Sequence, residues 1–305
     1  MTDFAAILTE ALKRNNSVAI VTIRQTQGST PRETGATMLV LACSTHGTIG
    51  GGQLELHATQ MARNMLSNGD NHLTLPLTLG PNMGQCCGGS VVLDMRLGLP
   101  ADVAALEAQA KEQSANRPVV MIFGAGHTGK ALAVQLAALP LRTILVDDRP
   151  EELANASAEV EKLMLEDPAL AILTAPQASA YVIMTHSHAL DYRLTEAALR
   201  RGDAAYVGLI GSDTKRARFL ASVRRSGHVN LAPFICPIGG GGVADKRPEI
   251  IAALTAAELL LTLFGQRTSQ DASHGASHGA LNGALNDASC ALTTSAKVSS
   301  HHDAA

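Results

Sequence analysis

The chain has 305 residues, of which 46% are hydrophobic, enough for one large or two ordinary domains with apolar cores. Its net charge is only −3 and its pI about 6.4, which excludes the strongly basic surface of a nucleic-acid-binding protein. No apolar run approaches the roughly 18 residues of a membrane span, and the N-terminus lacks a signal-peptide pattern, so we expect a soluble, cytoplasmic protein without nucleic-acid or membrane partners.

The first hundred residues predict an α+β domain. Strands are expected at Ser17–Arg24, Ala36–Ala42 and Ser90–Leu97, because these runs are rich in β-branched and long apolar residues. Between them, three glycines precede a segment with apolar residues at helical spacing, from Leu54 to Leu66. We place this N-terminal domain at residues 1–98.

The rest of the chain alternates strand and helix patterns. Residues 99–117, rich in Ala and Glu and bracketed by prolines, are expected to form a connecting helix or linker. Residues 118–265 then predict a Rossmann-like doubly wound parallel-sheet domain whose last helix is Arg247–Gly265. Residues 266–305 lose periodic hydrophobicity, which predicts a disordered tail.

A glycine-rich motif follows the first strand of this Rossmann-like domain. Gly124, Gly126 and Gly129 have the G-x-G-x-x-G spacing, which suits a tight turn that presents helix N–H groups to a pyrophosphate. Asp147 lies 23 residues after Gly124, where an acid can reach a ribose hydroxyl. His127 lies inside the loop, where it serves a ligand or merely caps the helix. The scaffold alone does not specify a ligand, so a cleft that holds no nucleotide stays an alternative.

Two N-terminal motifs are candidates for anion binding. The stretch GSTPRETG, residues 28–35, can present Arg32, whose planar guanidinium suits phosphate, although a solvated turn explains it equally well. The stretch TIGGGQLE contains Gly50, Gly51, Gly52 and Glu55. Its glycines predict either a backbone nest for an anion or a flexible entry to the helix.

Five scattered cysteines without a CxxC pair favour a reducing compartment. Cys86 and Cys87 are adjacent, and their Cα atoms, about 3.8 Å apart, are too close for a relaxed disulfide, which prefers roughly 4.4–6.8 Å. We therefore expect thiols. Neighbouring side chains of an extended segment point to opposite faces, and the following glycines favour Cys87 as the one that faces a ligand. Two small buried residues without chemistry are the alternative.

Polar residues also end a later strand. His186, His188 and Asp191 follow a buried run and are expected at the carboxyl edge of the parallel sheet, where ligands of this architecture bind. They suit metal binding, proton transfer or plain structural hydrogen bonding. The basic cluster of Lys215, Arg216 and Arg218, extended by Arg224 and Arg225, is expected to be a solvated helix face.

Taken together, the motifs resemble one family. GSTPRETGATMLV, TIGGGQLE, LGPNMGQCCGG, VMIFGAGHTGKALA, HSHALDYRLTEAALRRG and CPIGGGGVADKRPEI occur in order between Ser17 and Leu261. This pattern resembles the xanthine dehydrogenase accessory protein (XdhC) family. One departure is Gly240, within a run of four glycines, where close relatives tend to have a bulky apolar residue.

The resemblance implies a chaperone rather than an enzyme. Such a protein binds the molybdenum cofactor in its molybdopterin form, protects it while a cysteine desulfurase supplies the terminal sulfur, and inserts it into apo xanthine dehydrogenase. It implies cofactor binding at Cys87 and, less directly, Cys86, with Cys87 as a molybdenum ligand. A homodimer is reasonable for handover to a dimeric enzyme, and a separate nucleotide in the Rossmann cleft stays open.

Two other interpretations remain at this point. An NAD(P)-dependent oxidoreductase explains Gly124, Gly126, Gly129 and Asp147 but not the N-terminal motifs. A thiol redox sensor explains Cys86 and Cys87 alone.

Overall fold

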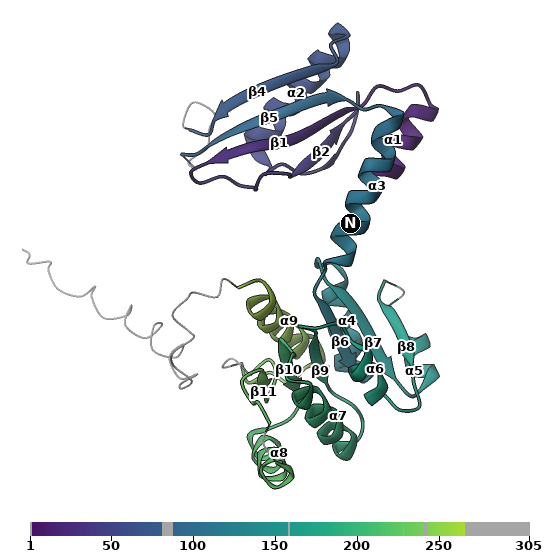
Figure 1. Cartoon of the computed structure of the whole chain (residues 1–305), viewed down its shortest axis with the longest axis vertical. Coiled ribbons are helices and arrows are strands. Elements are labelled where there is room, and N and C mark those ends of the chain that lie inside the picture. Colours follow the sequence, from purple (N-terminus) through teal and green to yellow (C-terminus); the bar gives the residue numbers. More distant parts are fainter. Residues whose placement is uncertain (1, 81–87, 158, 228, 241–242, 266–305) are drawn as a thin grey trace, which may run out of the picture. The chain divides into compact units, whose positions relative to one another are not determined.

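The structure, a computed structural model, describes residues 2–80, 88–157, 159–227, 229–240 and 243–265. This part of the chain contains an antiparallel sheet of order β3-β2-β1-β5-β4 and a parallel sheet of order β11-β10-β9-β6-β7-β8 (Figure 1). The predicted fold class, an α+β N-terminal part followed by a Rossmann-type parallel sheet, is confirmed.

The antiparallel sheet contains the three strands that the sequence predicts and two that it does not. The predicted strands are β1 (Ala19–Gln27), β2 (Thr37–Val40) and β5 (Ser90–Leu97). The additional ones are β3 (Thr45–Gly47) and β4 (His72–Thr78), both at edges of the sheet. β4 contains Pro76, which lacks an N–H donor and weakens the strand pattern, but an edge strand tolerates it.

Helices cover both faces of this sheet. Alternate residues of β1 point to opposite faces, so that Val21 packs under α2 (Gly52–Asn68) while Ile20 faces α1 (Phe4–Lys13) and α3 (Pro100–Ala115). The predicted connecting segment is thus a helix, α3, whose Leu106 joins the core beside α1.

The parallel sheet is buried on both faces along its central strands, as continuous apolar runs predict. Its strands are β6 (Val119–Phe123), β7 (Arg142–Asp147), β8 (Glu161–Met164), β9 (Ala180–Ile183), β10 (Tyr206–Leu209) and β11 (Phe234–Ile235). Its helices are α4 (His127–Ala137), α5 (Pro150–Ala154), α6 (Ala169–Thr174), α7 (His188–Arg201), α8 (Asp213–Ser226) and α9 (Pro248–Phe264). The chain winds outward from β6 in one direction and from β9 in the other, so the topological switch point lies between these two strands.

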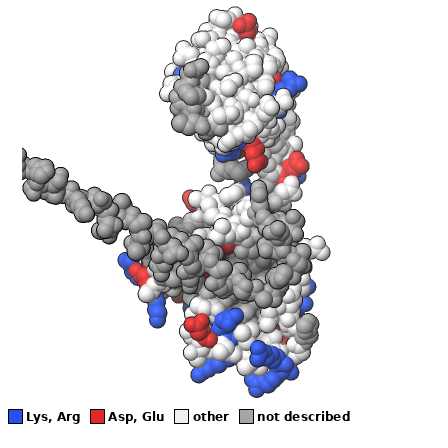
Figure 2. All heavy atoms as spheres, turned by 90° about the vertical axis from the view of Figure 1, so that its left-hand side faces the viewer, with Lys and Arg blue, Asp and Glu red and all other residues white. Residues whose placement is uncertain are grey.

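A buried ion pair joins α7 to α8 beside the switch point. Lys215 Nζ donates to Asp191 Oδ2 at 2.6 Å and to the Ile210 carbonyl at 2.8 Å, while Thr185 donates to Asp191 Oδ1 through its amide at 2.9 Å and its hydroxyl at 2.8 Å. The expectation of a solvated face is therefore wrong for Lys215, because α7 and α8 meet at the strand ends. The predicted exposure is confirmed for the four arginines of α8: Arg216, Arg218, Arg224 and Arg225. Figure 2 shows Lys and Arg gathered where α7 and α8 lie.

Among the described residues, no helix combines the length and the apolar character needed to cross a bilayer.

Removing one partner of the buried pair should destabilise the parallel-sheet part. Lys215→Met leaves Asp191 buried without a cation and should lower the free energy of unfolding by about 3 kcal/mol. Since the chain has no Trp and its three tyrosines all lie in this part, tyrosine fluorescence during urea unfolding reports on it selectively. Arg216→Met, a control on the exposed face of the same helix, should change stability by less than about 0.5 kcal/mol. Equal urea midpoints for the two variants would contradict the structural role of the pair.

Candidate functional site

Three motifs that are separate in sequence meet at one place in the N-terminal part. A methyl group on Gly89 would collide with the carbonyl oxygens of Gln27 and Ser29, so the backbone after the cysteine pair lies against the start of the 28–35 loop. A methyl group on Gly50 would lie within 2.8 Å of Pro31 Cβ. Only glycine permits these approaches, and the motif glycines therefore bring the three segments together.

The predicted backbone nest already holds a carboxylate of the chain itself. Glu55 Oε1 accepts hydrogen bonds from the amides of Ile49 at 3.0 Å and Gly51 at 2.9 Å, and from the Thr48 hydroxyl. Gly50, Gly51 and Gly52 have φ values of 133°, 80° and 60°, which let the turn wrap around this oxygen. An external anion at these two amides would have to displace Glu55.

The environment of Glu55 favours its ionised form. Partial burial opposes ionisation, but the hydrogen bonds from Thr48, Gly51, Ile49 and Gly50 outweigh it and hold the pKa of Glu55 below its ordinary value of 4.5. The carboxylate therefore fixes the turn at neutral pH and loses part of this advantage in acid.

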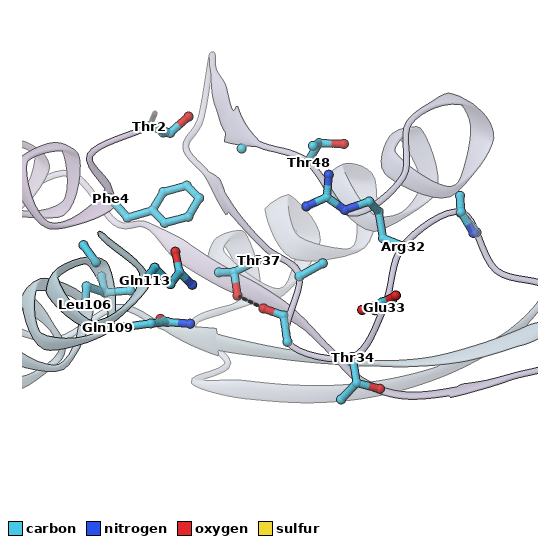
Figure 3. A pocket seen from close by; sticks show the side chains of 15 residues that line it. Thr2, Phe4, Arg32, Glu33, Thr34, Thr37, Thr48, Leu106, Gln109 and Gln113 are labelled. Atoms are coloured by element: carbon cyan, nitrogen blue, oxygen red, sulfur yellow. Dashed lines mark hydrogen bonds between the residues drawn. The ribbon is translucent and has the colours of Figure 1, made fainter. Parts of the chain in front are cut away.

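A cavity of about 950 Å³ opens beside the turn and the 28–35 loop. Arg32 and Thr48 lie at one end and Phe4, Leu106, Gln109 and Gln113 at the other (Figure 3). Arg32 and Glu33 are the charged side chains among the described residues that line it. Within the described part of the chain, the Arg32 guanidinium has no ion-pair or hydrogen-bond partner, so it is available to an anion.

Cys86 and Cys87 lie outside the described residues. The two glycines that follow them are described: the Gly88 amide donates to the Leu79 carbonyl at 2.8 Å, and the Leu79 amide donates to the Gly89 carbonyl at 2.7 Å. This pairing holds Gly88 and Gly89 at the edge of the motif cluster. The prediction that Cys87 contacts a ligand stays a prediction.

The glycines of the G-x-G-x-x-G turn have different surroundings. A methyl group on Gly124 would collide with the carbonyl of Met184, which directly follows β9, and one on Gly129 with the Gly124 carbonyl. Gly126, at the N-terminus of α4, has nothing within 4 Å of the same position, and His127 beside it is exposed. Two glycines thus serve backbone packing, and the third leaves the helix end accessible.

The Asp147 carboxylate is already hydrogen-bonded to groups of the chain itself. It accepts from the Ala125 amide at 2.5 Å and from Arg149, through Nε at 2.9 Å, Nη2 at 2.9 Å and the backbone amide at 3.0 Å. Burial opposes ionisation of Asp147, but these donors lower its pKa far below the ordinary range. Both oxygens are occupied, so the predicted contact with a ribose hydroxyl competes with Arg149.

The histidines at the carboxyl edge of β9 do not gather into a metal site. His186 and His188 are exposed, whereas Asp191 is buried in its pair with Lys215. The cavity that His186 lines with Gly124, Asp147 and Thr185 measures only about 10 Å³. Within the described ranges, no three His, Cys, Asp or Glu side chains are close enough to hold a metal ion.

Comparison with known proteins identifies the chain's relatives. The XdhC and CoxI family model matches residues 11–76, and the XdhC Rossmann domain model matches residues 120–259. The chain belongs to the XdhC family. The 28–35 and 48–55 motifs lie in the first matched stretch and the glycine-rich turn in the second, whereas α3 lies between them.

Two individual proteins resemble this XdhC family member. The uncharacterized protein YqeB of Escherichia coli (strain K12) is 28% identical over 277 residues, with 83% of this chain and 46% of YqeB covered. The chain therefore spans just under half the length of that relative. The crystal structure of a xanthine dehydrogenase from Bacillus halodurans superposes with a TM-score of 0.72 at 17% identity, covering 88% of this chain and 98% of that one. This second likeness establishes the fold alone.

The residues of α1 and α3 that line the large cavity were not identified from the sequence. Phe4, Leu106, Gln109 and Gln113 come from two helices whose patterns show only ordinary amphipathic or polar faces. The spacing of Leu106, Gln109 and Gln113, which puts them on one helix face, was the available signal.

Loss of the Glu55 charge should weaken the turn. Glu55→Gln keeps the shape but replaces a charged acceptor, and it should lower the free energy of unfolding by about 1 kcal/mol near neutral pH. Because the pKa of Glu55 is lowered in the folded state, its contribution is present above about 4.5 and is lost as the pH falls through the folded-state pKa. Urea unfolding followed by circular dichroism should thus show that the free energies of unfolding of Glu55→Gln and the wild type differ less in acid than at neutral pH.

The matched control for Glu55 is Glu33→Gln, which removes an exposed carboxylate from the neighbouring loop. It should leave the free energy of unfolding within about 0.5 kcal/mol of the wild-type value at every pH. A Glu55→Gln protein as stable as the Glu33→Gln protein at neutral pH would contradict the role given to Glu55.

Proposed function

We propose that this XdhC family member acts in the maturation of xanthine dehydrogenase as a non-catalytic carrier of the molybdenum cofactor. It binds the molybdopterin form, shields it while a cysteine desulfurase supplies the terminal sulfur, and passes it to apo xanthine dehydrogenase. A homodimer would match a dimeric acceptor.

The observation that carries this proposal is the meeting of the three N-terminal motifs beside a cavity of about 950 Å³. This volume is at the upper end of the roughly 300–1,000 Å³ range of ligand pockets, as a bulky cofactor requires. Membership of the XdhC family supports the maturation role, and the position of the motifs supports the N-terminal part as the place of binding.

Arg32 is the proposed anchor for the phosphate of molybdopterin. The nest amides of Ile49 and Gly51 are already satisfied by Glu55, whereas the guanidinium of Arg32 has no partner among the described residues. A planar guanidinium binds phosphate through two parallel hydrogen bonds, and each such charged contact is stronger than a neutral one. The phosphate is therefore assigned to Arg32 rather than to the glycines.

The proposed metal contact is the thiolate of Cys87. A soft thiolate suits a sulfur-rich molybdenum centre as a transient ligand or guard. Gly88 and Gly89, which follow Cys87 directly in the sequence, lie against the start of the 28–35 loop that carries Arg32, and this supports the choice of Cys87.

An NAD(P)-dependent oxidoreductase has less support. The carboxylate expected to bind a ribose hydroxyl, Asp147, is satisfied by Ala125 and Arg149, and the cavity at that edge measures about 10 Å³. A dinucleotide could bind there only if Asp147 gave up these hydrogen bonds and the cavity became larger.

The proposal is tested by anaerobic loading with molybdenum cofactor, removal of free ligand, and measurement of retained molybdenum and pterin. The wild type should retain both, Cys87→Ala should lose the molybdenum, and Arg32→Ala should retain pterin about tenfold less well, because a charged phosphate contact is lost. Cys86→Ala shows whether the neighbouring thiol contributes.

Two variants control for general effects of the substitutions. Cys43→Ala removes an exposed thiol, and Arg24→Ala removes an exposed arginine, both away from the cavity lining. Both should retain the cofactor as the wild type does. A wild type that retains no molybdenum or pterin while it binds NADH tightly would overturn the proposal in favour of the oxidoreductase.

A further inference from the structure

The face of α3 that borders the large cavity changes character along the helix. Leu106, Gln109, Ala110 and Gln113 all line the cavity, and their spacing puts them on one helix face. Leu106 is 9% exposed and belongs to the core beside α1, but the positions after it are exposed and include two carboxamides. Along the face that lines the cavity, the helix thus changes from a buried apolar residue to exposed positions that include two carboxamides.

The two carboxamides are free to bind a ligand. Within the described part of the chain, neither Gln109 nor Gln113 has a hydrogen-bond partner. Figure 3 shows both side chains extending from α3 toward the side on which the ring of Phe4 lies. The Phe4 ring rests against Gly47 of β3, where any larger residue would collide with it.

We propose that Gln109, Gln113 and the ring of Phe4 form a subsite for a planar heterocycle that carries a 2-amino-4-oxo pyrimidine edge. A carboxamide pairs with such an edge through one donor and one acceptor, as glutamine does with bases, and an aromatic ring offers a stacking surface. This edge occurs in pterins and in guanine. Resting on the proposed function, we assign it to the pterin of the cofactor.

The position of Arg32 agrees with this assignment. Arg32 lines the same cavity from the 28–35 loop, whereas the two glutamines line it from α3, so an anion and a heterocycle would be held from different walls. Molybdopterin carries its phosphate and its pterin at different ends. α3 lies between the two family-matched stretches, so the family match itself does not describe this subsite.

The subsite is tested with pterin-6-carboxylate, a fluorescent probe that carries the ring but no metal. The full-length wild type should bind it, and the double variant Gln109→Leu with Gln113→Leu should bind at least about tenfold more weakly, because two hydrogen bonds are lost. Gln60→Leu, which removes an exposed glutamine of α2 outside the cavity lining, should bind as the wild type does. A wild type that binds no probe, or a double variant with wild-type affinity, overturns the subsite.

Competitors distinguish the source of the edge. Guanosine should displace the probe more weakly than a second pterin does, and quinoxaline, a flat heterocycle without the amino and oxo groups of this edge, should not displace it. Displacement by quinoxaline overturns recognition of the edge, and tighter binding of guanosine than of pterin overturns the assignment to a pterin.

The same proteins separate this inference from the proposed function. If the wild type and the double variant retain the molybdenum cofactor equally and also bind the probe equally, the carrier function is supported and the subsite is refuted. If the wild type binds the probe and the double variant does not, but the wild type retains no molybdenum, the subsite is supported and the carrier function is refuted.

Discussion

The N-terminal site depends on one carboxylate oxygen. Glu55 Oε1 receives the amides of Ile49 and Gly51 and the hydroxyl of Thr48, and this closes a turn of three consecutive glycines with positive φ. Such a turn has a high conformational entropy when unfolded, so it needs a strong internal partner to hold one shape. The shape matters because Gly50 is the surface on which Pro31 rests, and Pro31 precedes Arg32. Glu55 thereby positions the arginine loop without touching it.

The glycine-rich turn after β6 is also stabilised by a carboxylate of the chain itself. The sequence presents both turns as receivers of external anions, and in both a carboxylate of the chain accepts the backbone N–H groups: Glu55 in one, and Asp147 at Ala125 in the other. A buried amide without an acceptor is costly, so a turn that must persist without ligand is stabilised by an internal acceptor. Glycine spacing alone therefore identifies a turn that can hold an anion, and it does not identify the anion.

Sequence patterns predicted the fold well and the site only partly. Long apolar runs such as β6 and β9 are buried on both faces and leave no alternative to a strand. Short or interrupted elements were missed, β4 because Pro76 breaks its pattern and β8 because four residues carry little periodicity. Lys215 was assigned to a solvated face because its neighbours are arginines, and only the meeting of α7 with α8 shows that Asp191 is its partner. Side-chain partners across elements depend on tertiary contacts, which local periodicity does not encode.

The distribution of paired and unpaired arginines favours the N-terminal cavity over the Rossmann cleft as the place proposed for an anionic ligand. At the end of β7, Arg149 is satisfied by Asp147, and Lys130 pairs with Glu152 at 2.5 Å. A phosphate that took Arg149 as its partner would have to break this ion pair and leave the buried Asp147 carboxylate without its cation, which is strongly unfavourable. Binding of a phosphate to Arg32 breaks no ion pair, since its guanidinium is exposed and unpaired within the described residues. An arginine thus has a different role at each turn. At the end of β7, Asp147 already binds Arg149, whereas in the N-terminal part Glu55 binds only the Thr48 hydroxyl and backbone amides and leaves Arg32 to an external anion.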